Sequence, residues 1–239
     1  MKKFLFTFTL LLIINFSFSQ KYYSNFYLGM RGSLMTSWLL TNKTTVNNTI
    51  DYLPTFASEF GLLFGFQWTR NFALQTEFLL SESNQRYSIR LKYPYPENRI
   101  VLKTIVIPVL VRFRVKHAYT EIGTAFNIKR RVWFEEDGLS RDNFEDTFSN
   151  FGFSGVLGIG GEFQLNQNIV YNIGFRTNVG FTDWQGVDYN GNSFESESED
   201  FMRSVNFGIY LVVRYQFKQI SKNPFVRKKR IKKSKRKFF

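Results

Sequence analysis

Bulky apolar residues alternate with small or polar residues along most of this chain between residues 25 and 217. In one segment, the apolar set Phe60, Leu62, Phe64, Phe66 and Trp68 alternates with Glu59, Gly61, Leu63, Gly65 and Gln67. A period of two is typical of β-strands whose two faces meet different surroundings, and apolar recurrence at helical spacing is scarce here. The pattern predicts eight strands, near residues 25–35, 56–68, 71–82, 100–114, 118–130, 150–165, 168–182 and 202–217.

The predicted connections between these strands alternate in length. Short ones fall at 69–70, 116–117 and 166–168, and long polar ones fall near 36–55, 83–99, 131–149 and 183–201. In a series of antiparallel strands, the short turns then gather at one end and the long loops at the other. Outer-membrane barrels have this asymmetry, with periplasmic turns and extracellular loops.

The size of the apolar face decides which way it points. An eight-stranded barrel has an interior that side chains only just fill, whereas this face offers on the order of 45 large residues. The apolar face must therefore point outward and the glycine-rich polar face inward, and such an exterior would be a very large apolar patch in water. We expect an all-β fold, an eight-stranded antiparallel up-and-down transmembrane β-barrel that is monomeric in its core.

Composition excludes several other classes of protein. The chain has 239 residues, of which 44% are hydrophobic and 19% aromatic, with no cysteine and one histidine. Intrinsic disorder of the main body, a disulfide scaffold and thiolate metal sites are excluded, and histidine-rich metal centres and most catalytic triads are disfavoured. We expect no cofactor, no metal site and no enzymatic activity.

The two ends of the chain differ from its body. Residues 1–20 place Lys2 and Lys3 before an apolar run and then small residues, which is typical of a cleaved secretory signal peptide; an N-terminal anchor is the alternative. The net charge of +13 is concentrated in residues 218–239, which hold 11 Lys and Arg and no acid. The expected organisation is a signal peptide (1–20), an outer-membrane barrel (21–217) and a basic periplasmic tail (218–239), whose composition predicts disorder.

Four segments resemble the eight-stranded outer-membrane barrels common in Bacteroidota, the porin-family or PorT-like proteins related in architecture to OmpA and OmpX. They are LQTEFLLSES with Glu77, TIVIPVLVRF with Pro108, GVLGIGGEFQL, and NIGFRTNVGF with Arg176. The resemblance implies the barrel fold and an integral place in a Gram-negative outer membrane, and it implies no particular activity. The family usually ends at the last strand, so the tail has no counterpart there.

Eight charged residues fall on the face predicted to line the lumen. Counted from the short-turn end, Arg112, Glu121, Glu162 and Arg214 lie about three residues up, and Arg31, Glu59, Glu77 and Arg176 lie roughly six to nine up. Across the turn at 116–117, Arg112 should face Glu121. Four arginines and four glutamates can pair into a neutral group, which a packed interior of low dielectric requires. We therefore expect a structural plug of ion pairs, and a gate or ion path is the functional alternative. Within the fourth predicted strand, Pro108 lacks a ladder donor and predicts a bulge or a local break.

The predicted outer loops and turns carry weaker signals. Asp188, Asn190, Asn192 and Glu199 occupy positions 1, 3, 5 and 12 of a calcium-loop count, but Ser193 stands where glycine is expected, and a solvated acidic loop is the alternative. His117 falls in a periplasmic turn, where we expect a solvated residue without a catalytic role. The tryptophans fall at strand ends or loop roots and are predicted to anchor the bilayer interface, with sugar platforms as an alternative for Trp133 and Trp184.

The basic tail has a dense run of cations at Arg227, Lys228, Lys229, Arg230, Lys232, Lys233, Lys235, Arg236 and Lys237. After an even number of strands the tail emerges in the periplasm, which disfavours a nucleic-acid partner. The candidate partners are peptidoglycan, inner-leaflet phosphates or an acidic periplasmic protein; a solvated extension without a partner is the alternative.

These inferences lead to one expected function with two alternatives. We expect a structural or interaction barrel that contacts outer-membrane lipid and lipopolysaccharide, displays acidic extracellular loops and has a filled, charged lumen. A narrow porin or a PorT-like secretion accessory is the first alternative. A lipid-modifying outer-membrane enzyme is the second.

Overall fold

A computed structural model of the chain describes residues 25–41, 50–53, 55–89, 97–136, 139–141, 145–186 and 202–217. The predicted signal peptide, the candidate calcium residues Asp188, Asn190, Asn192 and Glu199, and the basic tail lie outside the described residues. Eight long strands make up most of the described chain: β1 (Asn25–Thr41), β3 (Thr55–Gln67), β4 (Phe72–Ile89), β5 (Glu97–Val115), β6 (Ala118–Glu136), β8 (Phe151–Gln164), β9 (Ile169–Gly180) and β10 (Met202–Phe217). Two short strands, β2 (Ile50–Leu53) and β7 (Leu139–Arg141), and one 3-10 turn, η2 (Glu145–Thr147), complete it.

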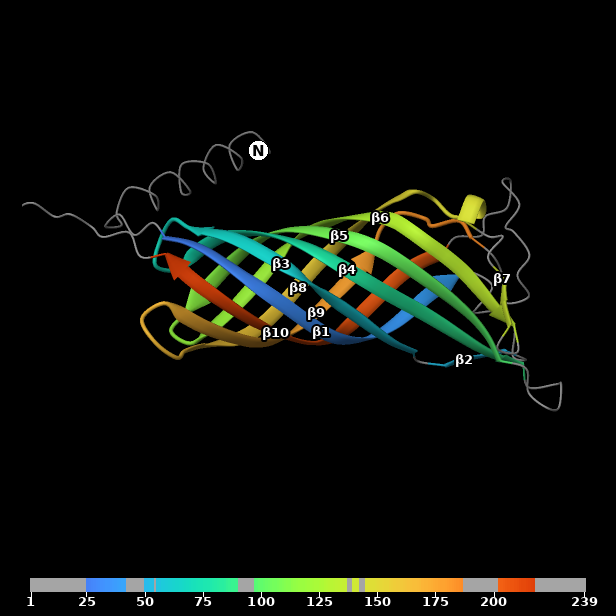
Figure 1. Cartoon of the computed structure of the whole chain (residues 1–239), viewed down its shortest axis with the longest axis horizontal. Helices are drawn as coiled ribbons and strands as arrows, with labels where there is room; N and C mark the ends of the chain where they lie inside the picture. Colours follow the sequence, from blue (N-terminus) through green and yellow to red (C-terminus); the bar gives the residue numbers. More distant parts are fainter. Residues whose placement is uncertain are drawn as a thin grey trace, which may run out of the picture.

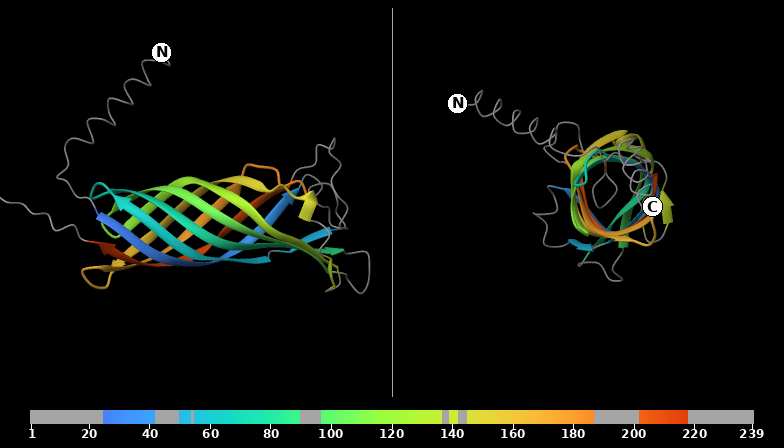
Figure 2. Two further views of the ribbon diagram at one scale, coloured as in Figure 1. Left: turned by 45° about the horizontal axis from the view of Figure 1, so that its top comes forward. Right: turned by 90° about the vertical axis from the view of Figure 1, so that its left-hand side faces the viewer.

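The eight long strands close into a barrel (Figures 1 and 2). Each pairs antiparallel with its neighbours in the order β4, β3, β1, β10, β9, β8, β6, β5, and an additional β4–β5 pairing closes the ring. The short strands β2 and β7 extend the edges of β4 and β6. Closure gives every long strand a partner on both sides. The backbone N–H and C=O groups of the wall can therefore bond to one another and need no water as a partner.

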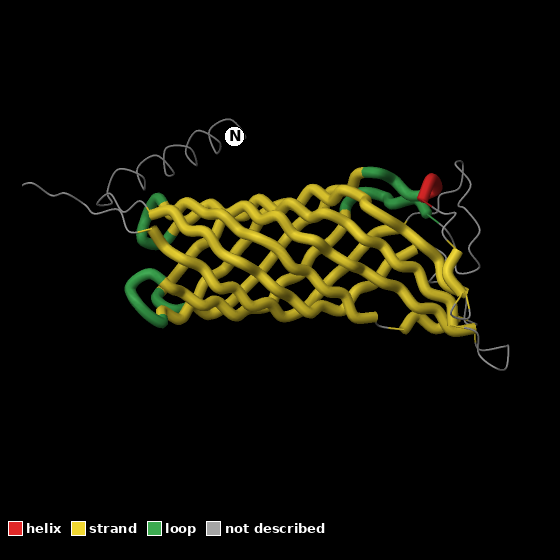
Figure 3. Tube along the Cα trace, in the orientation of Figure 1, coloured by secondary structure: helices red, strands yellow, loops and turns green. Residues whose placement is uncertain are grey.

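The three tight turns that join consecutive long strands lie at one end, where β1 begins and β10 ends (Figure 3). Side chains fix two of them: Thr69 Oγ1 accepts from the backbone N–H of Phe72 at 2.9 Å, and Asn166 Oδ1 accepts from that of Ile169 at 2.9 Å. In the third, Lys116 takes a φ of 55°, the left-handed conformation that a two-residue hairpin turn requires. Polar residues therefore fix the turns at this end of the barrel, which we call the turn end. The opposite end is the loop end.

The outside of the wall is apolar in a band of limited height. On β5 the outward positions from Ile105 to Val115 are all Ile, Val or Phe, and on β6 the outward positions from Ala118 to Ile128 are apolar or Thr. Large apolar side chains are also exposed on the other strands, such as Leu211 at 52% and Ile122 at 60%. The band is about eleven residues tall along a strand, which matches the roughly 9–11 residues that cross a bilayer when tilted. The predicted fold class, an eight-stranded antiparallel up-and-down transmembrane β-barrel, is confirmed.

The strands are longer at the loop end than the alternation predicted. β1 continues to Thr41, β4 to Ile89 and β6 to Glu136, into stretches predicted as loops, and β2 and β7 were not predicted. Those boundaries were wrong because the contrast between the two faces is lost there although the backbone pairing continues. On β4 the outward face becomes polar and charged, whereas on β1 the inward face becomes apolar at Met35 and Leu39.

Pro108 interrupts one ladder, as predicted. The β4–β5 pairing runs to Thr76–Val109 and resumes at Leu79–Val106, with no pairs between, and the register is unchanged. A separate register shift lies between Lys103 and Thr104, where β5 pairs with β6. Within the described ranges, no helix has the length and hydropathy needed to cross a membrane.

Candidate functional site: the closed lumen

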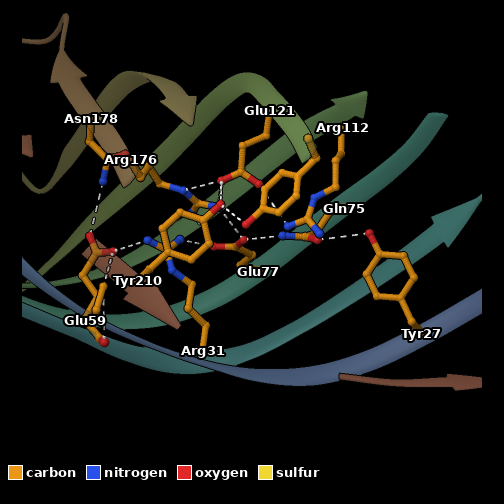
Figure 4. A network of polar contacts seen from close by, with 12 residues as sticks. Tyr27, Arg31, Glu59, Gln75, Glu77, Arg112, Glu121, Arg176, Asn178 and Tyr210 are labelled. Atoms are coloured by element: carbon orange, nitrogen blue, oxygen red, sulfur yellow. Dashed lines mark hydrogen bonds and ion pairs between the residues drawn. The ribbon is translucent and has the colours of Figure 1, made fainter. Parts of the chain in front are cut away.

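The pairing register brings charged side chains from distant parts of the chain into the lumen. Arg112 lies opposite Glu121 across the β5–β6 hairpin, as predicted. Arg31 on β1, Glu77 on β4 and Arg176 on β9 point inward from other parts of the wall (Figure 4). All of these side chains are almost fully buried, with Arg31 0% and Arg176 1% exposed. The eight predicted lumen residues thus share one interior.

Glu77 and Glu121 are the carboxylates at the centre of this network. Glu77 accepts from Arg31 Nη1 at 2.6 Å and from Arg176 Nη1 and Nη2 at 2.7 and 2.9 Å. Glu121 accepts from Arg176 Nε at 2.8 Å and from Arg112 Nη2 at 3.1 Å, and also pairs with Arg176 Nη2. Arg176 therefore binds both carboxylates with its planar fork of donors, a geometry that lysine cannot provide.

The network extends toward the loop end through Glu59. Its carboxylate accepts from Arg31 Nη2 at 3.2 Å, from the Ser33 hydroxyl at 3.2 Å and from the Asn178 amide at 3.3 Å. The central network thus contains the arginines 31, 112 and 176 and the glutamates 59, 77 and 121. Three cations balance three anions, so the buried group is neutral as a whole.

Three buried tyrosines pack against the arginines of the lumen. The guanidinium of Arg31 lies 4.7 Å and that of Arg176 lies 4.9 Å from the centre of the Tyr210 ring. The Tyr210 hydroxyl donates to Glu121 Oε1 at 3.0 Å and lies 2.7 Å from the Tyr119 hydroxyl. Tyr27 donates to Gln75, which in turn donates to Glu77 at 2.5 Å. The aromatic rings fill the space between the charged groups, and their hydroxyls satisfy carboxylate oxygens.

A second cluster lies nearer the turn end around Glu162. Arg214 Nη2 binds Glu162 Oε2 at 2.5 Å and Arg114 Nη1 binds Glu162 Oε1 at 2.6 Å. Arg114 was not among the predicted lumen residues, although it shares the inward parity of Arg112 on the same strand and could have been found from that. Because Glu121 pairs with Arg176 as well as Arg112, the two predicted layers are joined rather than separate.

An apolar cluster closes the lumen at the loop end. Its buried members are Leu39, Tyr87, Ile100, Leu102, Val132, Phe134, Phe148, Trp184 and Met202. Several come from strand extensions that were predicted as loops, so the sequence pattern did not reveal this cluster. Trp184 is only 2% exposed, and its ring lies over Gly152, where an added Cβ would approach it to 2.5 Å. The interpretation of Trp184 as an interface anchor or sugar platform was therefore wrong, because its chain segment folds back into the barrel.

Between the charged network and the apolar cluster lies a polar layer with little open space. Ser81, Ser83, Asn127, Asn178 and Asn206 contribute to it. The cavity they line has a volume of about 20 Å³, enough for about one water molecule. Among the residues that the structure describes, side chains thus fill the lumen from Glu162 to Trp184.

Gly158 makes room for the central network, because an added Cβ there would lie 2.7 Å from Glu121 Cγ and Oε1. We expect Gly158→Ala to lower the free energy of unfolding by about 1–3 kcal/mol, because the Glu121 carboxylate is held by two arginines and a tyrosine and must shift. The measurement is denaturant unfolding in micelles followed by tryptophan fluorescence. Gly32→Ala is the matched control, since nothing lies within 4 Å of an added Cβ at Gly32. Equal stability of the two variants would contradict this account of Gly158.

The structure also locates the histidine and tests for metal clusters. His117 is exposed in the β5–β6 turn and lines a cavity of about 430 Å³ at the turn-end mouth, with Arg70, Arg114 and Glu162. Its backbone carbonyl accepts from the Glu162 N–H at 2.7 Å. Among the residues that the structure describes, no group of three or more His, Cys, Asp or Glu could hold a metal ion.

Comparison with known proteins gives resemblances among solved structures only. No protein-family model and no curated protein matches this chain. The outer membrane protein OprG from Pseudomonas aeruginosa is 11% identical with a TM-score of 0.47, and the match covers 84% of this chain and 99% of that one. Neisserial surface protein A is 12% identical with a TM-score of 0.38, over 79% and 96% of the two chains. The outer membrane protein W of E. coli is 12% identical with a TM-score of 0.33, over 83% and 100%.

Proposed function

We propose that this chain is an integral outer-membrane β-barrel protein of structural or interaction type, whose lumen is closed and whose loop end faces the outside of the cell. The observation that carries the proposal is the pairing of an apolar exterior band with a charged, filled interior. This inverts the polarity of a water-soluble barrel, in which apolar side chains fill the inside.

The exterior band supports placement in a membrane. Its height of about eleven residues, at about 3.4 Å per residue and a tilt of about 45°, gives a band about 26 Å tall, close to the roughly 25 Å of outer-membrane barrels. Trp68, which is 41% exposed, lies at the turn-end edge of the band, where an amphipathic ring favours the bilayer interface. The long connections at the opposite end support the assignment of that end to the cell exterior.

The filled lumen supports a structural or interaction role over a porin. Two barriers lie in series: the ion-pair network around Glu77 and Glu121, and the apolar cluster that includes Phe148 and Trp184. Side chains fill the lumen at this network, and each of its arginines pairs with at least one carboxylate, which leaves no room for a hydrated ion. A PorT-like secretion accessory remains compatible with a closed barrel, and co-purification of partner proteins would distinguish it. Altered lipid A after deletion of the gene would identify a lipid-modifying enzyme.

The purified protein is expected to require detergent for solubility and to show negligible conductance in planar bilayers. Trp184→Ala removes one barrier and should leave the conductance negligible, because the ion-pair network beneath it still closes the lumen. Steady, large single-channel currents from the unmodified protein would overturn the closed lumen. Recovery of the folded protein from cells in a soluble fraction without detergent would overturn the membrane placement.

A further inference from the structure

The apolar exterior band ends abruptly on one side of the barrel, toward the loop end. On β5 the outward series changes from Ile107 and Ile105 to Lys103 and, beyond the buried Val101, to Arg99. On β6 it changes from Ile128 to Arg131. The strands themselves continue beyond this line, and Figure 1 shows β5 and β6 extending toward β7. The barrel wall on this side therefore presents cations immediately above the level of the acyl chains.

A β-bulge increases the density of charge at this line. Lys103 pairs with Arg131 and Thr104 with Lys129, so Arg130 is an extra residue on β6 with no partner across the ladder. The bulge shifts the inward parity of β6 from odd to even positions, and Arg130 and Arg131 are both exposed. A regular strand would send one of two consecutive arginines into the lumen; the bulge places both outside.

An aromatic ring and two carboxylates organise the cations. Lys103 Nζ lies 4.9 Å and the Arg131 guanidinium 5.7 Å from the centre of the Trp133 ring, whose Nε1 donates to Glu135 at 2.8 Å. Arg99 lies 3.6 Å from Glu135 Oε2, and Lys103 lies 3.4 Å from Glu82 Oε2. The outer cationic cluster, defined as Arg99, Lys103, Arg130, Arg131 and Trp133, thus holds four cations, of which Arg99 pairs with Glu135 and Lys103 with Glu82.

We propose that the outer cationic cluster binds the phosphate groups of lipopolysaccharide in the outer leaflet. The inference rests on the proposed function, because it requires the band to lie in an outer membrane with the loop end outside. The phosphates of lipid A lie at the boundary between acyl chains and sugar, which is the level at which these cations begin. Arginine binds phosphate through two parallel N–H donors, and lysine supplies a further point charge. Four cations along this line complement the negative charge of a phosphorylated headgroup, and the Trp133 ring suits the same interface.

The test measures binding of lipid A to the full-length protein folded in detergent micelles, by native mass spectrometry. The two probes are bisphosphorylated lipid A and the same lipid with both phosphates removed. The test variant combines Lys103→Gln, Arg130→Gln and Arg131→Gln. The unmodified protein should prefer the phosphorylated probe, and the test variant should bind that probe at least tenfold more weakly while its binding of the dephosphorylated probe is unchanged.

The matched control combines Arg70→Gln, Lys116→Gln and Lys218→Gln, which removes the same number of cations: two from turns at the turn end and one that directly follows β10 in the sequence. We expect it to bind phosphorylated lipid A within twofold of the unmodified protein. An equal loss in both triple variants would mean diffuse attraction to net charge and would overturn the site. Equal binding of the two probes by the unmodified protein would overturn it as well. A protein that stays folded and dissolved without detergent instead overturns the membrane placement, and this is seen before any lipid A is added.

Discussion

Arg176→Met is expected to lower the free energy of unfolding of the barrel by about 3–5 kcal/mol, the range for removing one partner of a buried ion pair. Arg176 is 1% exposed and supplies donors to both Glu77 and Glu121. Without it, the central network holds three carboxylates against two guanidinium groups, and burying the excess negative charge is costly. Denaturant unfolding and the heat-dependent gel shift of the folded barrel would measure the change.

Two further variants separate this effect from loss of packing. Arg70→Met removes an exposed arginine from the turn between β3 and β4 and should change stability by less than about 0.5 kcal/mol, as surface substitutions usually do. Glu77→Gln should be less costly in the background of Arg176→Met than in the unmodified protein, because it then removes the unpaired charge. If the two changes were simply additive, the coupling between Arg176 and Glu77 would be negligible and the account of the network would fail.

Leu211→Arg is expected to be the most damaging single change on the outer face. Leu211 points outward from β10, is 52% exposed and lies near the middle of the apolar band. An arginine at the midplane of a bilayer costs about 2–4 kcal/mol in a transmembrane barrel, whereas an exposed arginine in water costs little. Unfolding in lipid vesicles would give the value.

The same substitution outside the band provides the control. Leu165 is 67% exposed in the turn between β8 and β9, so Leu165→Arg should cost no more than about 1 kcal/mol. Equal tolerance of the two substitutions would mean that Leu211 does not face acyl chains, and the membrane placement would then be wrong.

The inward direction of the charged residues could be predicted because a strand has a period of two. Once the apolar positions were assigned to the outside, Arg31, Glu77 and Arg176 had to lie inside, and the hairpin at 116–117 set Arg112 opposite Glu121. Which arginine binds which glutamate could not be predicted. Arg176 and Glu77 are 99 residues apart, and their contact depends on the stagger of strands around the closed ring.

At the loop end, local sequence patterns were not sufficient to predict which side chains point into the lumen. Val132 and Phe134 point inward only because the bulge at Arg130 shifts the parity of β6, and an alternation read directly from the sequence misses such a shift. Trp184 stands among polar residues in the sequence, so its burial depends on an interior space that forms only when the ring closes.

By itself, the sequence determined the barrel class, the number of long strands, the outward apolar face and the short turns, because each follows from side-chain alternation and turn chemistry over a few residues. The tertiary structure alone decided the partners in the ion-pair network, the apolar cluster at the loop end, and the gathering of Arg99, Lys103 and Arg131 around Trp133. Those features join strands through closure, stagger and a bulge, which are properties of the whole ring and not of any one segment.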